Sequence, residues 1–111
     1  MRLGGAAALA VITAITAAPV APADQYDYVI ALDNQGIYYE SISDIIDIGK
    51  LACSNLRSGT PQYAGSVATS AGYSSSEVGI IILAATNNMC PDQIPTLRAY
   101  VQSAFPPSPG V

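Results

Sequence analysis

The groups in this chain that could do chemistry are two cysteines, eight carboxylates and seven tyrosines, and the chain contains no histidine. Histidine is the side chain that serves most often as a general base at neutral pH and as a metal ligand. Cys53 and Cys90 lie 37 positions apart, whereas the two thiols of a redox centre usually occur as C-x-x-C. Two cysteines without histidine also cannot supply the usual four ligands of zinc. We therefore expect no metal and no cofactor.

The carboxylates and serines fit helix capping better than catalysis. The aspartates do not follow the D-x-D-x-D-G spacing of a calcium loop, and no acid lies inside an apolar stretch that would select a general acid or base. The serines at 74–76 have no histidine to activate them and lie in no G-x-S-x-G motif. Ser74 is instead followed three residues later by Glu77, the pattern of a capping box. We expect that the protein is not an enzyme.

Tyrosine is the prominent aromatic residue, with seven tyrosines against one phenylalanine and no tryptophan. Tyr38 and Tyr39 are adjacent, so one of the two rings must point outward on most backbones. An exposed tyrosine often marks an interaction surface, because its ring buries apolar area while its hydroxyl forms hydrogen bonds. Packing of a loop with solvated hydroxyls is the other interpretation. Tyr38 and Tyr39 are the candidate interaction surface.

The first 23 residues have the pattern of an export signal. Arg2 precedes an apolar run, and the run ends in Ala21-Pro22-Ala23, a small-x-small cleavage pattern, immediately before Asp24. We expect cleavage after Ala23, which makes Asp24 the new N-terminus of a secreted or cell-envelope protein. An uncleaved membrane anchor is the alternative, because an apolar run of about 18 residues is at the lower limit for a span. Any contact with a membrane is expected only through this uncleaved segment.

Cap and stop signals divide the rest of the chain into short helices. The first helix is expected from an Asp24 cap to Gly36, and the second from Ser41 or Ser43 to Gly59. The third is expected over residues 61–71, with proline at its first position. The fourth is expected from Ser74 towards Met89, and a short last helix begins at Pro95. The sequence thus predicts an all-α fold, a small bundle of four to five short helices. Residues 1–23 are the expected signal peptide, 24–105 the helical domain and 106–111 a flexible, proline-rich tail.

Apolar residues at helical spacing indicate the buried faces. The expected core residues are Tyr26, Val29 and Ile30 in the first helix, Ile45, Ile48, Ala52, Cys53 and Leu56 in the second, Tyr63 and Val67 in the third, and Val78, Ile81, Ile82, Ala85 and Met89 in the fourth. Gly49 lies inside the second helix, where glycine costs about 1 kcal/mol relative to alanine, so a close packing contact is expected there. In an oxidising compartment Cys53 and Cys90 are expected to form one disulfide that joins the second and fourth helices.

The run from Gly79 to Ala85 is apolar on most faces of the expected fourth helix. One interpretation is a central helix that is buried all round. The other is an apolar groove that takes a lipid or a partner helix. The periodicity of the run leaves both open.

Six residues connect the chain to a known family. Gly49, Cys53, Leu56, Gly59, Cys90 and Pro91 follow the pattern G…C-x-x-L-x-x-G…C-P. With the export segment and the acid-rich first helix, this pattern resembles the small exported proteins of mycobacteria and their relatives that are catalogued as domain of unknown function 732. The resemblance implies an all-helical domain with one disulfide, outside the cytoplasm, and supplies no activity. One departure is Asn88-Met89 before Cys90, where the family often has an aromatic residue.

The charge of the chain restricts its partners. Four basic residues stand against eight acids, and the formal net charge is −4. Binding to nucleic acid and docking on anionic lipid both depend on basic side chains, so neither is expected. We expect a monomeric, non-catalytic binding domain whose partner is an unknown protein or an apolar ligand. The alternative is a carrier of a small apolar or lipid ligand, in a cavity between the second and fourth helices lined by Ile45, Ile48, Val78 and Ile82.

Overall fold

The computed structural model describes residues 24–106. The predicted signal peptide with Ala21 and Ala23, and residues 107–111 of the predicted tail, lie outside this range. The elements are α2 (Gln25–Asn34), α3 (Ile42–Arg57), the 3-10 turn η1 (Pro61–Tyr63), α4 (Ser66–Ser70), α5 (Ser75–Met89), the 3-10 turn η2 (Pro91–Gln93) and α6 (Ile94–Ala104). Residues 24–106 contain no strand, and the predicted all-α fold with a disulfide is confirmed.

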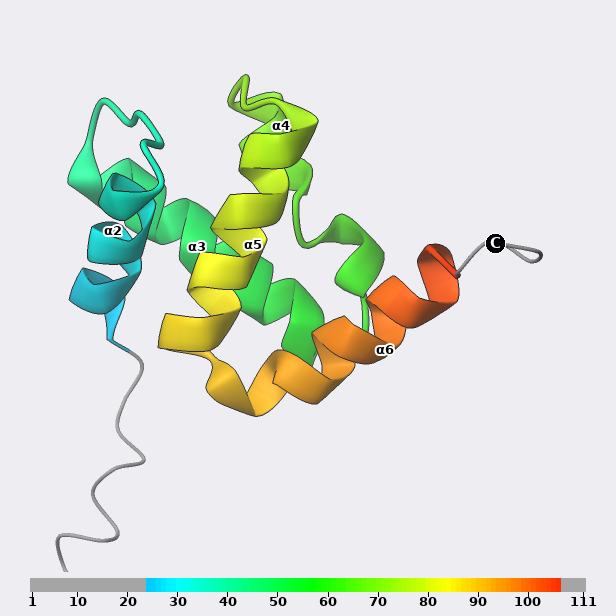
Figure 1. Ribbon diagram of the computed structural model, residues 1–111. Coiled ribbons are helices and arrows are strands. Elements are labelled where there is room, and N and C mark those ends of the chain that lie inside the picture. Colours follow the sequence, from blue (N-terminus) through cyan, green and yellow to red (C-terminus); the bar gives the residue numbers. More distant parts are fainter. Residues whose placement is uncertain (1–23, 107–111) are drawn as a thin grey trace, which may run out of the picture.

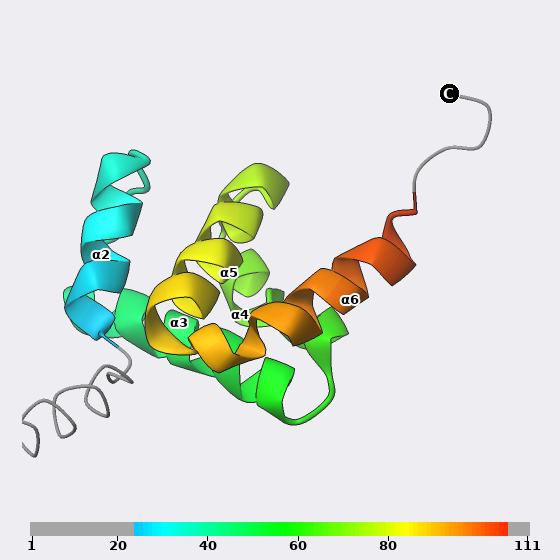
Figure 2. The same cartoon turned by 60° about the horizontal axis from the view of Figure 1, so that its bottom comes forward.

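Three helices, α2, α3 and α5, form the body of the domain by packing against one another in pairs. Figure 2 shows α2 and α5 standing side by side across the long α3. The α6 helix follows η2 at the end of α5 and contacts η1, η2 and α5. It then runs away from the body of the domain, as both views show (Figures 1 and 2). The C-terminal helix therefore contains no fully buried residue, although its Leu97 packs against the core.

Side-chain caps explain where the main helices begin. The Asp24 carboxylate accepts hydrogen bonds from the backbone N–H groups of Tyr26 and Asp27, at 2.8 and 3.1 Å. Ser41 caps α3, and Ser74 and Glu77 form both halves of the predicted capping box of α5. Each cap satisfies backbone N–H groups that have no partner within the helix. The predicted starts of these three helices are confirmed.

Tyr28 lies at the centre of the core and is completely buried. Its hydroxyl donates a hydrogen bond of 2.8 Å to the backbone carbonyl of Ile45. Its ring covers Gly49, where an added Cβ would lie 2.7 Å from the ring carbon Cζ. The close packing predicted at Gly49 is confirmed, and its cause is the tyrosine ring from α2.

The buried face of α2 differs from the prediction. Tyr28, Val29 and Leu32 are buried, whereas Tyr26 and Ile30 are exposed. Apolar residues occur on more than one face of this helix, so helical spacing alone does not select the buried one. On the face that is buried, the Tyr28 ring packs over Gly49 of α3.

The prediction of the third helix also differs from the structure. The chain forms η1 and α4 in place of one helix over 61–71, and buries Ala64 and Ala68 while Tyr63 and Val67 are exposed. The interruption lies at Gly65, where a Cβ would be 2.5 Å from Cγ1 of Val78. A side chain at this position would clash with α5, and the small alanines likewise allow α4 to approach the core closely.

Helix α5 has one buried side and one open side. Ile81, Ala85 and Met89 of the predicted stripe are buried, Val78 and Ile82 are partly buried, and Leu83 is exposed. The helix is therefore not buried all round, and the groove interpretation of the 79–85 run gains a structural basis. The last helix, predicted from Pro95, begins one residue earlier at Ile94.

Candidate functional site

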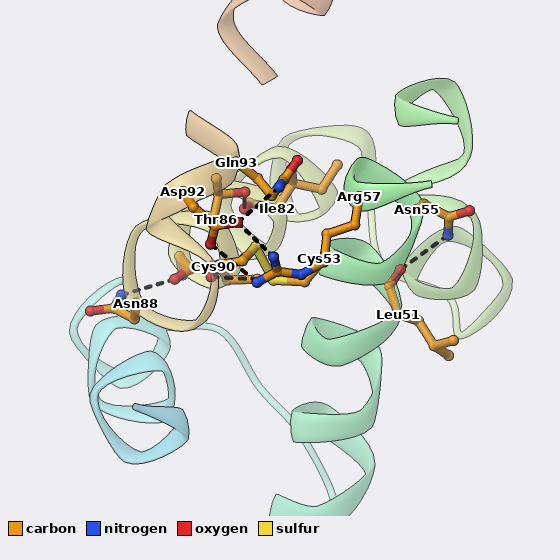
Figure 3. Close-up of a disulfide and its surroundings, with 12 residues drawn as sticks. Leu51, Cys53, Asn55, Arg57, Ile82, Thr86, Asn88, Cys90, Asp92 and Gln93 are labelled. Atoms are coloured by element: carbon orange, nitrogen blue, oxygen red, sulfur yellow. Dashed lines mark hydrogen bonds and ion pairs between the residues drawn. A yellow bond between two sulfur atoms is a disulfide. The ribbon is translucent and has the colours of Figure 1, made fainter. Parts of the chain in front are cut away.

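The disulfide joins Cys53 in α3 to Cys90 at the end of α5, with 6.0 Å between the Cα atoms (Figure 3). Cys53 is 7% exposed and Cys90 is fully buried. Arg57 and Asp92 form a two-pronged ion pair next to it, between α3 and η2. The hydrogen bonds from Arg57 hold the pKa of the Asp92 carboxyl below its usual value. The disulfide is thus a covalent clamp between α3 and the end of α5, made by two residues that are almost inaccessible to solvent.

The two candidate tyrosines have different environments. The Tyr38 side chain is 71% exposed. Tyr39 packs partly against the core, and its hydroxyl donates a 2.8 Å hydrogen bond to the Asp33 carboxylate. The structure thus points one ring of the pair outward and the other inward, as expected for adjacent residues in a connector. Tyr38 can be replaced without loss of core packing, whereas Tyr39 cannot.

A third tyrosine, Tyr73, completes this surface. It follows α4, and its hydroxyl donates a 2.7 Å hydrogen bond to the backbone carbonyl of Tyr38. Sequence reasoning missed Tyr73, because the two residues are 35 positions apart and only the fold brings them together. The bond fixes the backbone of Tyr38 while its side chain stays exposed.

These tyrosines border a hollow of about 390 Å³, the tyrosine hollow. Its walls are Tyr38, Tyr39 and Tyr73, Ile45 and Ile48 contribute apolar surface, and three carboxylates, Glu40, Asp44 and Glu77, lie along it. The lining contains no lysine or arginine. Lys50 and Arg57 line a different hollow, beside the disulfide. The charge of the tyrosine hollow is therefore negative and is not compensated from within its lining.

The hydroxyls of Tyr39 and Tyr73 both have a raised pKa. The hydrogen bond to the Asp33 carboxylate raises the pKa of Tyr39. Partial burial raises the pKa of Tyr73, and the carboxylates of Glu77 and Glu40 raise it further. Neutral phenols keep donating the two hydrogen bonds that hold the surface in place.

A second concave site, of about 770 Å³, lies between α5 and α6 and is termed here the α5–α6 groove. Its apolar side consists of Val78, Ile82 and Leu83 from α5 and Leu97, Val101 and Phe105 from α6 and the residue that follows it. Its polar side consists of Gln62, Ser66, Thr69 and Ser70 from η1 and α4. No charged residue lines it. Helix α6 diverges from α5 along its length (Figure 2), and the groove that both helices line is completed by η1 and α4.

The four residues predicted to line one cavity between the second and fourth helices, α3 and α5, line two different hollows instead. Ile45 and Ile48 lie at the tyrosine hollow, whereas Val78 and Ile82 lie at the α5–α6 groove. Between α3 and α5 the interior is filled by buried side chains such as Ala52, Ile81 and Ala85. Val78 and Ile82 are partly buried, and their side chains approach Gly65, between η1 and α4, at the edge of the α5–α6 groove.

Within residues 24–106, no group of three or more histidine, cysteine, aspartate or glutamate side chains could hold a metal ion. No helix of this part of the chain is both long enough and apolar enough to span a bilayer.

Comparison with known proteins gives one match. The family model for proteins of unknown function DUF732 matches residues 23–92. No curated protein and no solved structure matches the chain. The matched residues include the disulfide and the whole tyrosine hollow, whereas α6 lies after them. The α5–α6 groove is thus built partly from residues outside the family match.

Proposed function

Because the chain belongs to the DUF732 family of proteins of unknown function, we propose its function from the geometry of its surface. The domain is a secreted, non-catalytic binding module that takes a lysine or arginine side chain of a partner protein in the tyrosine hollow. The observation that carries the proposal is the exposed Tyr38 ring, held on a fixed backbone next to three carboxylates with no basic residue in the same lining.

Both parts of the hollow favour a positive charge. A cation over the face of a tyrosine ring is attracted by the ring quadrupole, typically by about 0.5–1 kcal/mol at an exposed site. Carboxylates at the rim attract a cation over longer range and speed its association. Glu40, Asp44 and Glu77 would repel phosphate and carboxylate groups for the same reason. A basic side chain of a protein therefore matches the hollow better than an anion does.

The site is also organised before binding. The Tyr73 hydroxyl is bonded to the Tyr38 carbonyl, and the Tyr39 hydroxyl is bonded to Asp33. Surfaces that are already ordered lose less conformational entropy when a partner binds. This pre-organisation supports a binding function for a surface of three tyrosines.

The test uses a tetra-arginine peptide as the probe and a tetra-citrulline peptide of the same shape without the charges. Glu40→Gln and Tyr38→Ser are each expected to weaken tetra-arginine binding roughly two- to fivefold in titration calorimetry. Tetra-citrulline is expected to bind negligibly. Neither variant removes the Tyr73 bond, because that bond ends on the Tyr38 backbone.

The matched control is Asp47→Asn, which removes one exposed carboxylate from α3 outside the hollow. It changes the net charge as much as Glu40→Gln does, and it should leave the affinity unchanged. Equal losses for Asp47→Asn and Glu40→Gln would mean that only the overall charge attracts the peptide, and the proposed site would be rejected.

Secretion is part of the proposal. The export pattern before Asp24 and the disulfide in a small domain both support it. N-terminal sequencing of the protein from the culture medium should give Asp24 as the first residue. Recovery only from membranes, with Arg2 still present, would support the uncleaved anchor instead.

A carrier of a small apolar ligand is the second candidate function. The observation that favours it is the uncharged α5–α6 groove, whose volume of about 770 Å³ is within the usual range for small-molecule sites. This function and the first use different faces and do not exclude each other.

A further inference from the structure

Apolar side chains on α5 and α6 lie uncovered along the α5–α6 groove. Leu83 is 54% exposed, Val101 43% and Phe105 70%. Helix α6 spans 11 residues and contains no buried residue. Isolated helices of this length are marginal in water, so a molecule that covers the apolar stripe of α6 would also stabilise the helix.

The lining restricts what that molecule is. One side of the groove is aliphatic and aromatic, and the other carries the amide of Gln62 and the hydroxyls of Ser66, Thr69 and Ser70. No basic residue is present to pair with an anionic head group, and no acidic residue is present to pair with a cationic one. Burial of an unpaired charge is costly, whereas uncharged polar groups can bond to hydroxyls and amides.

We propose that the α5–α6 groove binds a neutral single-chain amphiphile with a hydroxyl-bearing head, of the monoacylglycerol class. The acyl chain of the ligand lies between Ile82 and Leu83 on one side and Val101 on the other. The head group of the ligand contacts Ser66 and Thr69. This inference rests on the carrier function proposed above and is independent of the tyrosine hollow.

Gly79 allows a direct test. It is exposed on α5 within the groove lining, and a Cβ added there meets nothing within 4 Å. Gly79→Leu therefore fills the groove without a clash at Cβ, while Gly79→Ala adds only one methyl group and is the matched control. Thermal unfolding followed by circular dichroism should show that both variants fold at least as stably as the wild type.

The probe is monolauroylglycerol below its critical micelle concentration, measured by titration calorimetry. Gly79→Leu is expected to lose at least about tenfold in affinity, and Gly79→Ala less than about threefold. Laurate, with the same chain and an anionic head, is expected to bind at least about fivefold more weakly than the glyceride. Amide shifts in NMR spectra should be concentrated in α4, α5 and α6.

Several results would overturn the inference: unchanged affinity in Gly79→Leu, equal binding of laurate, or amide shifts centred on α2. A dimer at micromolar concentration in sedimentation velocity, dissociated by Gly79→Leu, would assign the groove to a second copy of the chain instead. The two proposals fail separately, because Glu40→Gln should leave glyceride binding intact and Gly79→Leu should leave tetra-arginine binding intact.

Discussion

Gly49 and Gly79 both lie inside long helices, yet alanine at the two positions is expected to change stability in opposite directions. At Gly49 the new methyl group would lie 2.7 Å from Cζ and 3.0 Å from the hydroxyl oxygen of Tyr28. Tyr28 is fully buried and its hydroxyl is bonded to the Ile45 carbonyl, so the ring has little freedom to move. At Gly79 no atom lies within 4 Å of the new methyl group.

The magnitude follows from two contributions. Alanine in place of glycine in a helix interior contributes about 0.5–1 kcal/mol of stability at both positions. At Gly49 this gain is opposed by overpacking, which costs roughly 1–3 kcal/mol in a well-packed core. The net expectation is a loss of about 1 kcal/mol for Gly49→Ala and a gain of up to about 1 kcal/mol for Gly79→Ala. For a domain of this size that difference is on the order of 10 °C in Tm.

The assay is guanidinium unfolding of the oxidised protein, followed by far-ultraviolet circular dichroism. The double variant Tyr28→Leu with Gly49→Ala tests the cause, because a smaller side chain at position 28 removes the clash. In a double-mutant cycle, Gly49→Ala should be less damaging when combined with Tyr28→Leu than in the wild type. A Gly49→Ala protein as stable as Gly79→Ala would refute the reasoning that the Tyr28 ring fixes the α2–α3 contact.

Three further predictions concern the clamp, a cap and the ion pair. Replacing both Cys53 and Cys90 by alanine should lower the unfolding free energy by about 4 kcal/mol, the chain-entropy value for a loop of this length. In the wild type, the intact mass after alkylation without reductant should show no free thiol. Ser74→Ala should cost about 1 kcal/mol in chemical unfolding, because it removes the capping hydroxyl of α5. Arg57→Gln should raise the pKa of Asp92 towards its ordinary value, followed by NMR titration of the carboxyl carbon. Since the pKa of Asp92 is lowered in the folded wild type, the pair stabilises above the ordinary carboxyl pKa and its contribution disappears as pH falls through the lowered value.

Local signals in the sequence were sufficient for the starts of α2, α3 and α5 and for the disulfide. The Asp24 cap and the Ser74–Glu77 capping box act within a few residues, so the sequence contains the whole interaction. The disulfide was predictable because only two cysteines are present. Gly49 signalled a close contact, although not the identity of the ring that makes it.

The contacts that were missed are those that depend on the fold. Residue type does not show whether Tyr26 or Tyr28 is buried. Which of the two is buried depends on how α2 crosses α3 above Gly49. Tyr73 reaches the Tyr38 carbonyl only because α4 brings it back to the connector after α2. The α5–α6 groove depends on the direction in which α6 leaves η2, which no periodicity in Ile94–Ala104 specifies.

The central claim is that the tyrosine hollow receives a basic side chain. The most direct measurement is an intermolecular NMR experiment on the disulfide-bonded protein with tetra-arginine, recording nuclear Overhauser effects between arginine side-chain protons and aromatic ring protons. The account predicts contacts from the arginine Hδ protons to the rings of Tyr38 and Tyr73, which weaken as salt is added. Saturating peptide without contacts to either ring, or with contacts only to tyrosines outside the hollow such as Tyr63, would contradict it.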